Sequence, residues 1–562
     1  MASGTLGTAL SGLMAAQIGI RTTQHNISNI NTAGFRRQEV GYAALLPDTY
    51  GLNYVGTGVS VSTVRNLYSQ FQDSQLLLDQ AQLSRNQAYA SSATQVDTLA
   101  GDANTGLTSA LDAFFEATQT VASDPTSNAA RQVMLSAGRN LAGRFNTLAN
   151  AFDQISSNTN REIAATVTRI NTFASQIAQL SGNINRAEAG NGQLANDLRD
   201  QRDQLVSELN KLINVTPIQQ SDGAFNLFVA NGQPLVVGTS MTRMSVDADA
   251  TTPEFDVPTL EFAGGYSISL DVSMVSGGTL GGLMAVREDV LEPAMRDLDR
   301  LALVFAERFN TQHVAGFDKQ GGQGVEFFTS ATILPKFLQP AALTDNLGNQ
   351  AFSASISNFA ELQASDYELS YDGINYTLTR LSDGASSPAA AIAVINGISQ
   401  GFTLTPGVGT PQAGDRWLIR PSYGAAASIA LNADIINDPN KSAADKIAAS
   451  ATIAGSPGDN RNAVWLADLQ TLTTAINGTD SFFSAYAQLV SRSATLASEA
   501  DINLSAYETL TNQSKASQQA ISGVNLDEEA ANLIRFQQAY QAAARAMQIS
   551  TGLFEDLLGA VR

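Results

Sequence analysis

The stretch that governs the fold is the C-terminal run GVNLDEEAANLIRFQQAYQAAARAMQISTGLFEDLLGAV, residues 523–561. Its apolar side chains recur every seven residues, and a few others widen the stripe: Leu526, Leu533, Tyr540, Met547, Phe554 and Val561, with Phe536, Ala543 and Leu557 beside them. Acidic residues at 527–529 fall in the first helical turn, where the helix dipole favours negative charge. A period of seven sustained over three heptads or more predicts a coiled-coil helix.

The N-terminus carries the same period. Its apolar positions predict a helix from about residue 3 to residue 28: Leu6, Leu10, Leu13, Ile20 and Ile27. The first 34 residues contain one formally charged side chain, Arg21, and four glycines lie inside the predicted helix. Each glycine costs about 1 kcal/mol relative to alanine, so the helix needs a partner. We expect the two terminal helices to pair with each other and then with neighbouring subunits; the alternative is that each packs on its own domain.

Composition excludes several classes of function. The 562-residue chain has 32 basic and 52 acidic side chains, a formal net charge of −20, so nucleic-acid and anionic-membrane partners are disfavoured. It has no cysteine, and its two histidines, His25 and His313, share no ligand-like spacing. We therefore expect no metal and no cofactor, and interpret each histidine as hydrogen-bonded or exposed. No apolar run approaches the ~20 residues that span a bilayer, and residues 1–7 lack the features of a Sec signal peptide.

Between the ends, the period changes twice. Long helices are predicted over 70–212, with a break at Asp124-Pro125, and the charges at 199–203 predict a solvated helix face. Alternating apolar residues predict hairpins around Asn231-Gly232 and Asp372-Gly373. The sequence thus predicts an α+β multidomain chain, with β-rich domains inserted between helical halves and projecting outward. Its expected parts are terminal coiled-coil helices (1–60 and 520–562), a helical body (61–213, 286–335 and 424–519), a first β-rich domain (214–285) and a second (340–423).

Catalytic motifs are scarce. Gly397-Ile398-Ser399-Gln400-Gly401 matches the G-x-S-x-G nucleophile pattern, but no histidine follows it and no helix is predicted after it. We therefore expect no enzyme, and the catalytic set is empty. The alternative is a surface-displayed hydrolase that uses carboxylates of the β-rich domains, which a chain with 52 acidic residues leaves open.

Two segments at opposite ends resemble a known family. The run NISNINTAGFRR, residues 26–37, ends the first predicted helix with turn-forming residues. It is similar to the N-terminal signature of bacterial flagellar rod, hook and hook-associated proteins, and residues 523–540 resemble their C-terminal signature. Residues 106–152 and 277–283 further resemble the first hook-associated proteins, the family of the hook–filament junction. The alternative within this resemblance is a hook or rod subunit.

The resemblance implies a function and a set of partners. It implies a structural adapter between flagellar hook and filament that leaves the cytoplasm unfolded through the flagellar type III export channel and polymerises through its terminal helices. Its expected partners are a ring of like subunits, the hook protein, the third hook-associated protein on the filament side, and a cytosolic export chaperone. The chaperone would cover the apolar stripe of the C-terminal helix, which would otherwise be exposed.

The candidate interface residues come from both ends. From the N-terminal segment they are Leu6, Leu10, Leu13, Ile20, Ile27, Asn29, Thr32, Gly34 and Phe35. From the C-terminal helix they are Leu526, Leu533, Phe536, Tyr540, Met547, Phe554 and Leu557. We expect these side chains to serve assembly and the chaperone at different times.

Overall fold

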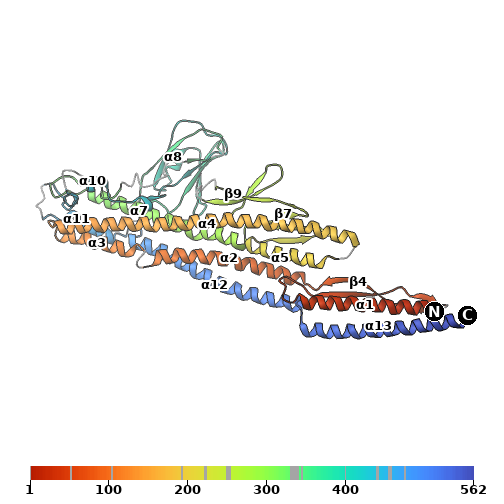
Figure 1. Ribbon diagram of the computed structural model, residues 1–562. Helices are drawn as coiled ribbons and strands as arrows, with labels where there is room; N and C mark the ends of the chain where they lie inside the picture. Colours follow the sequence, from red (N-terminus) through yellow and green to blue (C-terminus); the bar gives the residue numbers. More distant parts are fainter. Residues whose placement is uncertain are drawn as a thin grey trace.

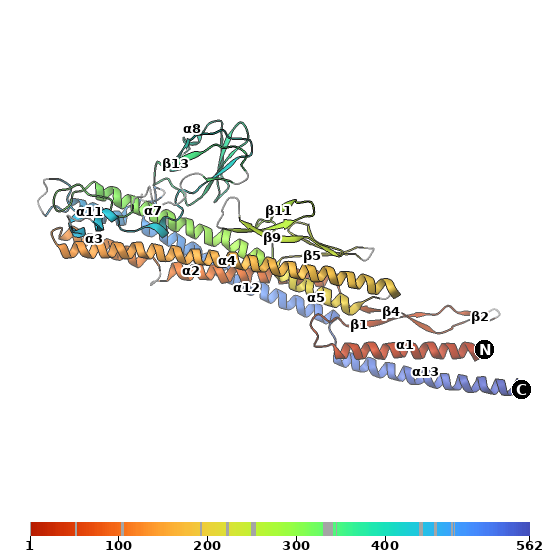
Figure 2. The same ribbon diagram turned by 45° about the horizontal axis from the view of Figure 1, so that its top comes forward.

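The computed structural model describes most of the chain: residues 2–50, 53–102, 106–191, 194–220, 224–248, 255–329, 341–343, 346–398, 400–437, 442–453, 458–473, 476 and 478–561. The molecule is elongated, with a helical body that leads to a narrower pair of terminal helices, α1 (Ala2–Ser28) and α13 (Leu526–Val561) (Figure 1). Both chain termini lie at the far end of this pair. Two β-rich units project from one side of the body (Figure 2). The predicted α+β multidomain class is therefore confirmed.

Long helices form the body: α2 (Gln70–Gly101), α3 (Thr108–Ser123), α4 (Asn128–Asn191), α5 (Asn196–Leu212), α6 (Gly278–Val286), a π-helical turn (Arg287–Leu291), α7 (Glu292–Val314) and α12 (Phe482–Ser522). Serine caps begin two of them. The hydroxyl of Ser69 accepts from the Gln72 N–H at 3.5 Å, and that of Ser481 from the Ser484 N–H at 3.1 Å. The break predicted at Asp124-Pro125 is confirmed, because α3 ends just before it and α4 starts just after it.

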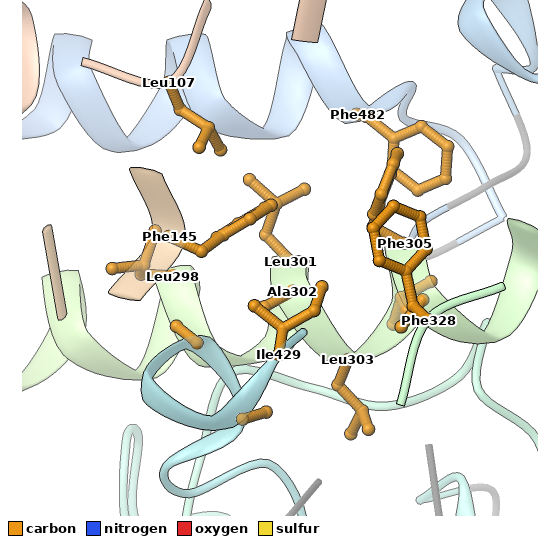
Figure 3. Packing of buried hydrophobic residues seen from close by; sticks show 14 of the residues in the cluster. Leu107, Phe145, Leu298, Leu301, Ala302, Leu303, Phe305, Phe328, Ile429 and Phe482 are labelled. Carbon is orange, nitrogen blue, oxygen red and sulfur yellow. The ribbon is translucent and has the colours of Figure 1, made fainter. Parts of the chain in front are cut away.

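Aromatic rings fill the core of the body. Phe114 of α3 lies 5.0 Å from Phe309 of α7, measured between ring centroids, and Phe327 lies 4.9 Å from Phe328 in the loop that follows α7. Figure 3 shows Phe305, Phe328 and Phe482 converging on the same cluster, so α12 joins it as well. Helices from both halves of the sequence thus share one core, which keeps the two chain ends together.

His313 ends α7 inside this core. Its Nε2 accepts a hydrogen bond from the Ala448 N–H at 3.0 Å, and its Nδ1 lies 2.5 Å from the Val325 carbonyl oxygen. An accepting Nε2 places the proton on Nδ1, so the ring is neutral. Burial lowers the pKa of His313 to about 4. Of the two expected states, hydrogen-bonded or exposed, His313 has the first, and it is buried as well.

We expect His313 to make the body less stable in acid. Below pH 6.5 an unfolded chain protonates this histidine, whereas the folded protein does not until about pH 4. The free energy of unfolding therefore decreases as pH falls from 6.5 to about 4. The decrease is at most about 3 kcal/mol, because each unit of pKa shift corresponds to 1.36 kcal/mol. Urea unfolding at pH 7.5 and 5 should show a smaller pH effect in His313→Gln than in the unmodified protein. An equal pH effect in both would contradict this assignment.

The first β-rich unit holds two small sheets. One has the order β5-β6-β7-β8 and the other β11-β10-β9. The hairpin predicted at Asn231-Gly232 is confirmed between β6 and β7, and both turn residues have positive φ, +59° and +93°. The strands are β5 (Thr216–Gln219), β6 (Phe225–Val229), β7 (Gln233–Val237), β8 (Ser240–Met241), β9 (Arg243–Ala248), β10 (Asp256–Glu261) and β11 (Ser267–Ser269).

The second β-rich unit has a five-stranded sheet, order β12-β18-β14-β15-β16, and a separate pair, β13 with β17. The hairpin predicted at Asp372-Gly373 is confirmed between β14 and β15, where Gly373 has a φ of +100°. Buried Trp417 anchors the unit by donating its indole N–H to the Gln350 carbonyl at 3.0 Å. The elements are β12 (Ala341–Ala342), β13 (Phe352–Ile356), β14 (Tyr367–Tyr371), β15 (Tyr376–Arg380), β16 (Ser386–Ala389), α8 (Ile392–Ile395), β17 (Phe402–Pro406) and β18 (Arg416–Ile419).

The helical prediction is wrong for two segments. Residues 29–60, assigned to the terminal helices, leave α1 through a turn and form a β-ribbon: β1 (Gln38–Ala44), β2 (Asp48–Tyr50), β3 (Asn53–Val55) and β4 (Val59–Asn66). The run Val59-Ser60-Val61-Ser62 alternates with the period of a strand, which favours this outcome.

The second segment is 424–481, which was expected to be helical apart from a loop at 455–460. It contains only short helical pieces: α9 (Ala425–Ser428), α10 (Ala433–Ile436), a 3-10 turn (Ala443–Lys446), α11 (Arg461–Asp468) and another 3-10 turn (Leu469–Thr471). Its path is fixed by tertiary contacts, for example by buried Arg131, which donates to the carbonyls of Ala444 and Ile447. Such contacts leave no periodic signal in the sequence.

Candidate assembly interface

Helices α1 and α13 pack antiparallel along a seam of small residues. A Cβ built on Gly12 would lie 3.7 Å from the Cβ of Ala543, and one on Gly19 would lie 2.8 Å from the ring of Phe536. These positions are seven residues apart in both helices, so the pairing is a heptad repeat. The glycines that weaken an isolated helix are therefore what lets α13 approach α1 closely. The predicted pairing of the two ends is confirmed.

Phe536 and Ala543 of the predicted stripe lie in this seam, whereas Leu13 of α1 and Leu533 of α13 lie beside it. Ser11 precedes Gly12 and accepts a hydrogen bond from the Val59 N–H, so that flank of α1 faces the β-ribbon. Leu13 follows Gly12 and therefore projects about 100° to the other side of the seam, away from the ribbon. Phe536 of α13 packs against Tyr42 of the ribbon, with ring centroids 6.4 Å apart. Leu533, almost one turn before Phe536, is turned to the flank that the ribbon leaves free.

The rest of the two stripes consequently shares one open face of the helix pair. Leu6, Leu13, Ile20, Ile27, Leu533 and Met547 are half-buried, whereas Leu10, Leu526, Tyr540 and Phe554 are exposed. Phe554 keeps 46% of its surface exposed and Leu526 keeps 52%. Phe536 is used within the chain, and the side chain of Leu557 lies outside the described residues. An exposed apolar face of this length indicates a contact with another protein.

The predicted turn residues end α1 and build the loop that follows. Asn29 donates to the His25 carbonyl at 3.0 Å, and Thr32 donates to the Asn29 side chain at 3.1 Å. Gly34 has a φ of +79°, and a Cβ there would lie 2.8 Å from Gln204, so the turn requires glycine. Phe35 packs edge-on against His25 at 5.3 Å between ring centroids. Loop 29–35 thus reverses the chain onto the body.

Two adjacent arginines bind this loop to opposite partners. Arg37 donates to Glu529 at 2.7 Å and to Glu528 at 2.6 Å in the first turn of α13. Glu529 is almost fully buried and also accepts from the side chain of Asn26 at 3.1 Å. A buried, fully bonded polar group in an apolar seam favours one register over the others. Arg37 therefore belongs to the terminal helix pair.

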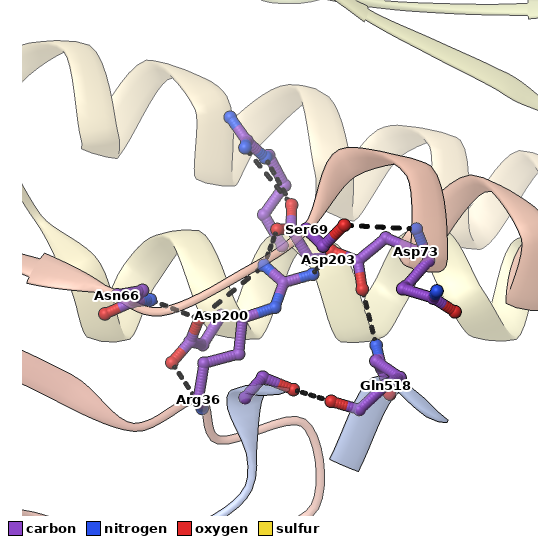
Figure 4. A network of polar contacts seen from close by, with 10 residues as sticks. Arg36, Asn66, Ser69, Asp73, Asp200, Asp203 and Gln518 are labelled. Carbon is purple, nitrogen blue, oxygen red and sulfur yellow. Dashed lines mark hydrogen bonds and ion pairs between the residues drawn. The ribbon is translucent and has the colours of Figure 1, made fainter. Parts of the chain in front are cut away.

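Arg36 points instead into the body. Its guanidinium forms ion pairs with Asp203 of α5 and, at 2.9 Å, with Asp73 of α2, and its backbone N–H donates to Asp200 at 3.1 Å (Figure 4). Gln518 of α12 donates to Asp73 at 2.7 Å, so α12 is part of the same network. We call Arg36, Asp73, Asp200 and Asp203 the joint cluster. Burial raises the pKa of Asp200 to about 7, against the lowering effect of its bond and proximity to Arg36.

The joint cluster corrects one prediction and adds residues that were not predicted. The charges at 199–203 were expected to form a solvated face, but Asp200 and Arg202 are buried. Arg202 stacks 3.8 Å above the ring centroid of Phe225. Arg36, Arg37 and Glu529 lie within the two signatures, but their pairing depends on partners remote in the sequence, which periodicity does not show.

Other candidate chemistry was also located. Ser399 of the G-x-S-x-G match lies outside the described residues. Within the described ranges, no group of three or more His, Asp or Glu residues could hold a metal ion. None of the helices in the described part of the chain is both long and apolar enough to cross a membrane.

Known proteins share these features. The family model described as the flagellar hook-associated protein FlgK helical domain matches residues 93–328. A D2-like domain of flagellar hook-associated protein 1 matches 342–421, and the C-terminal region of flagellar basal body rod FlgEFG proteins matches 517–560. Flagellar hook-associated protein 1 of Escherichia coli K12 is 34% identical over 99% of both chains, and that of Bacillus subtilis 168 is 26% identical over 98% of this chain and 97% of its own.

A solved structure agrees with the fold. The flagellar hook junction protein FlgK from Burkholderia pseudomallei has a TM-score of 0.69 and 25% identity, covering 80% of this chain and all of that one. The paired ends, the helical body and these matches define the class of flagellar axial proteins. Within this class, the chain belongs to the flagellar hook-associated protein 1 family, a family of structural proteins of the flagellum. The resemblance inferred from the sequence is confirmed.

Proposed function

We propose that this chain is the structural adapter subunit that joins the flagellar hook to the filament. The observation that carries the proposal is the open apolar face of the helix pair α1 and α13, a pair that lies at one end of the helical body. Large apolar side chains contribute about 1.5–3 kcal/mol each when they become fully buried. Like subunits arranged in a ring would bury this face between them. The candidate residues Leu6, Leu13, Ile20, Ile27, Leu533 and Met547 would then form the contacts between copies.

The same face suits the partners that we propose. Hook protein would meet the ring on one side, and the third hook-associated protein on the filament side. Before export from the cytoplasm, a chaperone would cover α13, since Leu526, Tyr540 and Phe554 are exposed even when α1 is in place. An amphipathic helix bound in a groove is the expected mode. Export in an unfolded state would leave pairing of the two ends for the site of assembly.

A structural role without catalysis is favoured by the state of the carboxylates. In the second β-rich unit, hydrogen bonds that hold turns lower the pKa of Asp372 and Asp383. At Asp415 burial raises the pKa, but the bonds from the backbone N–H groups of residues 347, 348 and 412 outweigh it and leave the pKa lowered. A general acid needs a raised pKa. Raised carboxyl pKa values occur in the helical body, for example at Asp200 and Asp299. These three carboxylates therefore do not suit the general acid of a hydrolase. The match over 93–328 disfavours the alternative of a hook or rod subunit.

Immunogold labelling of detached flagella with an antibody against residues 340–422 tests the proposal. We expect one narrow band of label where the hook meets the filament. Label along the whole hook would instead identify a hook subunit. Absence of label from flagella, in cells that express the protein, would contradict a flagellar role altogether.

A further inference from the structure

The outer ridge of α4 is basic in a strongly acidic protein. Over its length α4 carries six arginines against three carboxylates, whereas the whole chain has a net charge of −20. Arg139, Arg161 and Arg186 are exposed, and the 22 and 25 residues that separate them are close to six and seven whole helical turns. They therefore lie along one line, about 70 Å long at 1.5 Å per residue. Arg169 is exposed beside this line.

Within the residues that the structure describes, neutral groups rather than acidic ones hold these arginines. Arg186 donates to the side chain of Asn183 at 2.6 Å, and Arg161 donates to Asn158, so neutral amides hold the guanidinium groups in place. In the described part of the chain, none of Arg139, Arg161, Arg169 and Arg186 forms an ion pair. The inner face of α4 is filled by buried residues such as Phe145, so the ridge is a separate, polar face. We call it the α4 ridge.

An acidic groove lies elsewhere on the same body. It runs between α2 and α12, has a volume of about 540 Å³, and places Asp97 of α2 and Asp501 of α12 in its lining. Glu508 is exposed two turns further along α12. Its other lining side chains are mostly small, so a helix can approach closely: Thr94, Ala494, Ala497, Ser498, Ile502 and Ser505. We call it the α2–α12 groove.

The ridge and the groove are separated within one subunit. Helix α2 forms one wall of the groove and α7 packs against both α4 and α12, so the ridge and the groove lie on different helices of the body. The α4 ridge therefore cannot neutralise the groove of its own chain. A second copy can do so, because one copy then offers a ridge to its neighbour on one side and a groove on the other. Such a heterologous contact repeats around a ring and closes when the rotation permits.

We propose that the α4 ridge of one copy packs along the α2–α12 groove of a second copy of this chain. This contact rests on the proposed function, since it requires copies held side by side. The contact of the terminal helices is stabilised by apolar burial. The contact proposed here is instead guided and oriented by opposite charges. Both surfaces are exposed, so the contact weakens steeply with salt.

Charge reversal on each surface tests the contact. Three double variants of the full chain are compared with the unmodified chain: Arg161→Glu/Arg169→Glu on the ridge, where the two sites are about 12 Å apart, Asp97→Lys/Asp501→Lys in the groove, and Arg65→Glu/Arg243→Glu as a control. The control residues are exposed and lie outside α4, and their reversal changes net charge as much as the ridge variant does. Circular dichroism melts establish that each variant folds. The measured quantity is the number of fluorescent chains deposited per purified hook. It is counted once at low salt and once at high salt, and the two counts are compared.

We expect the ridge and groove variants each to deposit at least about tenfold less than the control at low salt, and to lose most of their salt dependence. Combining all four reversals in one chain should restore deposition, because each ridge again meets a groove of opposite charge. If the unmodified chain deposits but the ridge variant equals the control, or if the combination fails to restore deposition, this contact is overturned alone. If the unmodified chain fails to deposit on hooks, the proposed function fails together with it.

Discussion

Leu533→Asp abolishes assembly at the end of the hook while the body of the protein stays folded. Leu533 is half-buried on the open face of the terminal pair, next to the seam with α1. A neighbouring subunit that covers this face would have to bury an unpaired carboxylate, which costs several kcal/mol and exceeds what one apolar contact contributes. The aromatic core that holds the body lies in other helices, so its stability is unaffected.

Two further variants sharpen this prediction. Phe554→Asp changes the same face nearer the C-terminus and should have the same effect. Gln541→Asp adds the same charge to α13 at an exposed position turned away from the seam, and should assemble normally. Junctions are counted by electron microscopy, and thermal unfolding of each purified chain reports on the body. Normal junctions in Leu533→Asp would refute the assignment of this face to assembly.

Local periodicity predicted the helices well because an apolar repeat is a local property of the chain. The heptads at Leu526 and Leu6 predicted that both ends are helical and that they pair. They did not reveal which residues form the seam. On α1 the seam is formed by Gly12 and Gly19, and glycines give no hydrophobic signal, whereas their partners Ala543 and Phe536 on α13 belong to the predicted stripe. The rest of the apolar stripe was left for other partners, a division that is apparent only when both helices are seen together.

Charged residues were harder to interpret than apolar ones. A charged run such as Arg199 to Asp203 is most often solvated. Here that expectation fails, because loop 29–35 folds back onto the body and Arg36, which follows the loop, binds Asp200 and Asp203. The β-ribbon was missed for a related reason, since its strands lie directly after a signature that was interpreted as a simple link between helix and body. In both cases the decisive partner is remote in the sequence. A pair of adjacent arginines after a turn is the one local clue.

The joint cluster gives the second large effect. Arg36→Glu should free the loop that connects the terminal pair to the body, because it places a fourth carboxylate beside Asp73, Asp200 and Asp203. Breaking a fully buried ion pair from one side costs about 3–5 kcal/mol, and this part-buried cluster should lose about 3 kcal/mol, the lower end of that range. The backbone N–H of Arg37 donates to the Ser522 carbonyl at 2.9 Å and reports on whether the loop is docked. Its hydrogen exchange should therefore accelerate about a hundredfold or more, at 1.4 kcal/mol per tenfold.

Lowering the pH should partly reverse the faster hydrogen exchange of Arg36→Glu, and the direction of this pH effect follows from the titration of Asp200. Its pKa is raised to about 7 from 3.8, so lowering the pH from 8 to 6 protonates it in the folded protein and removes one of the crowded negative charges. The acceleration in Arg36→Glu relative to the unmodified protein at the same pH should thus shrink as pH falls. Arg65→Glu breaks only an exposed pair with Glu39, worth at most about 1 kcal/mol, and should exchange almost normally. Equal exchange at Arg37 in both variants would show that the joint is held by the apolar contacts of the loop, such as Phe35 on His25, rather than by Arg36.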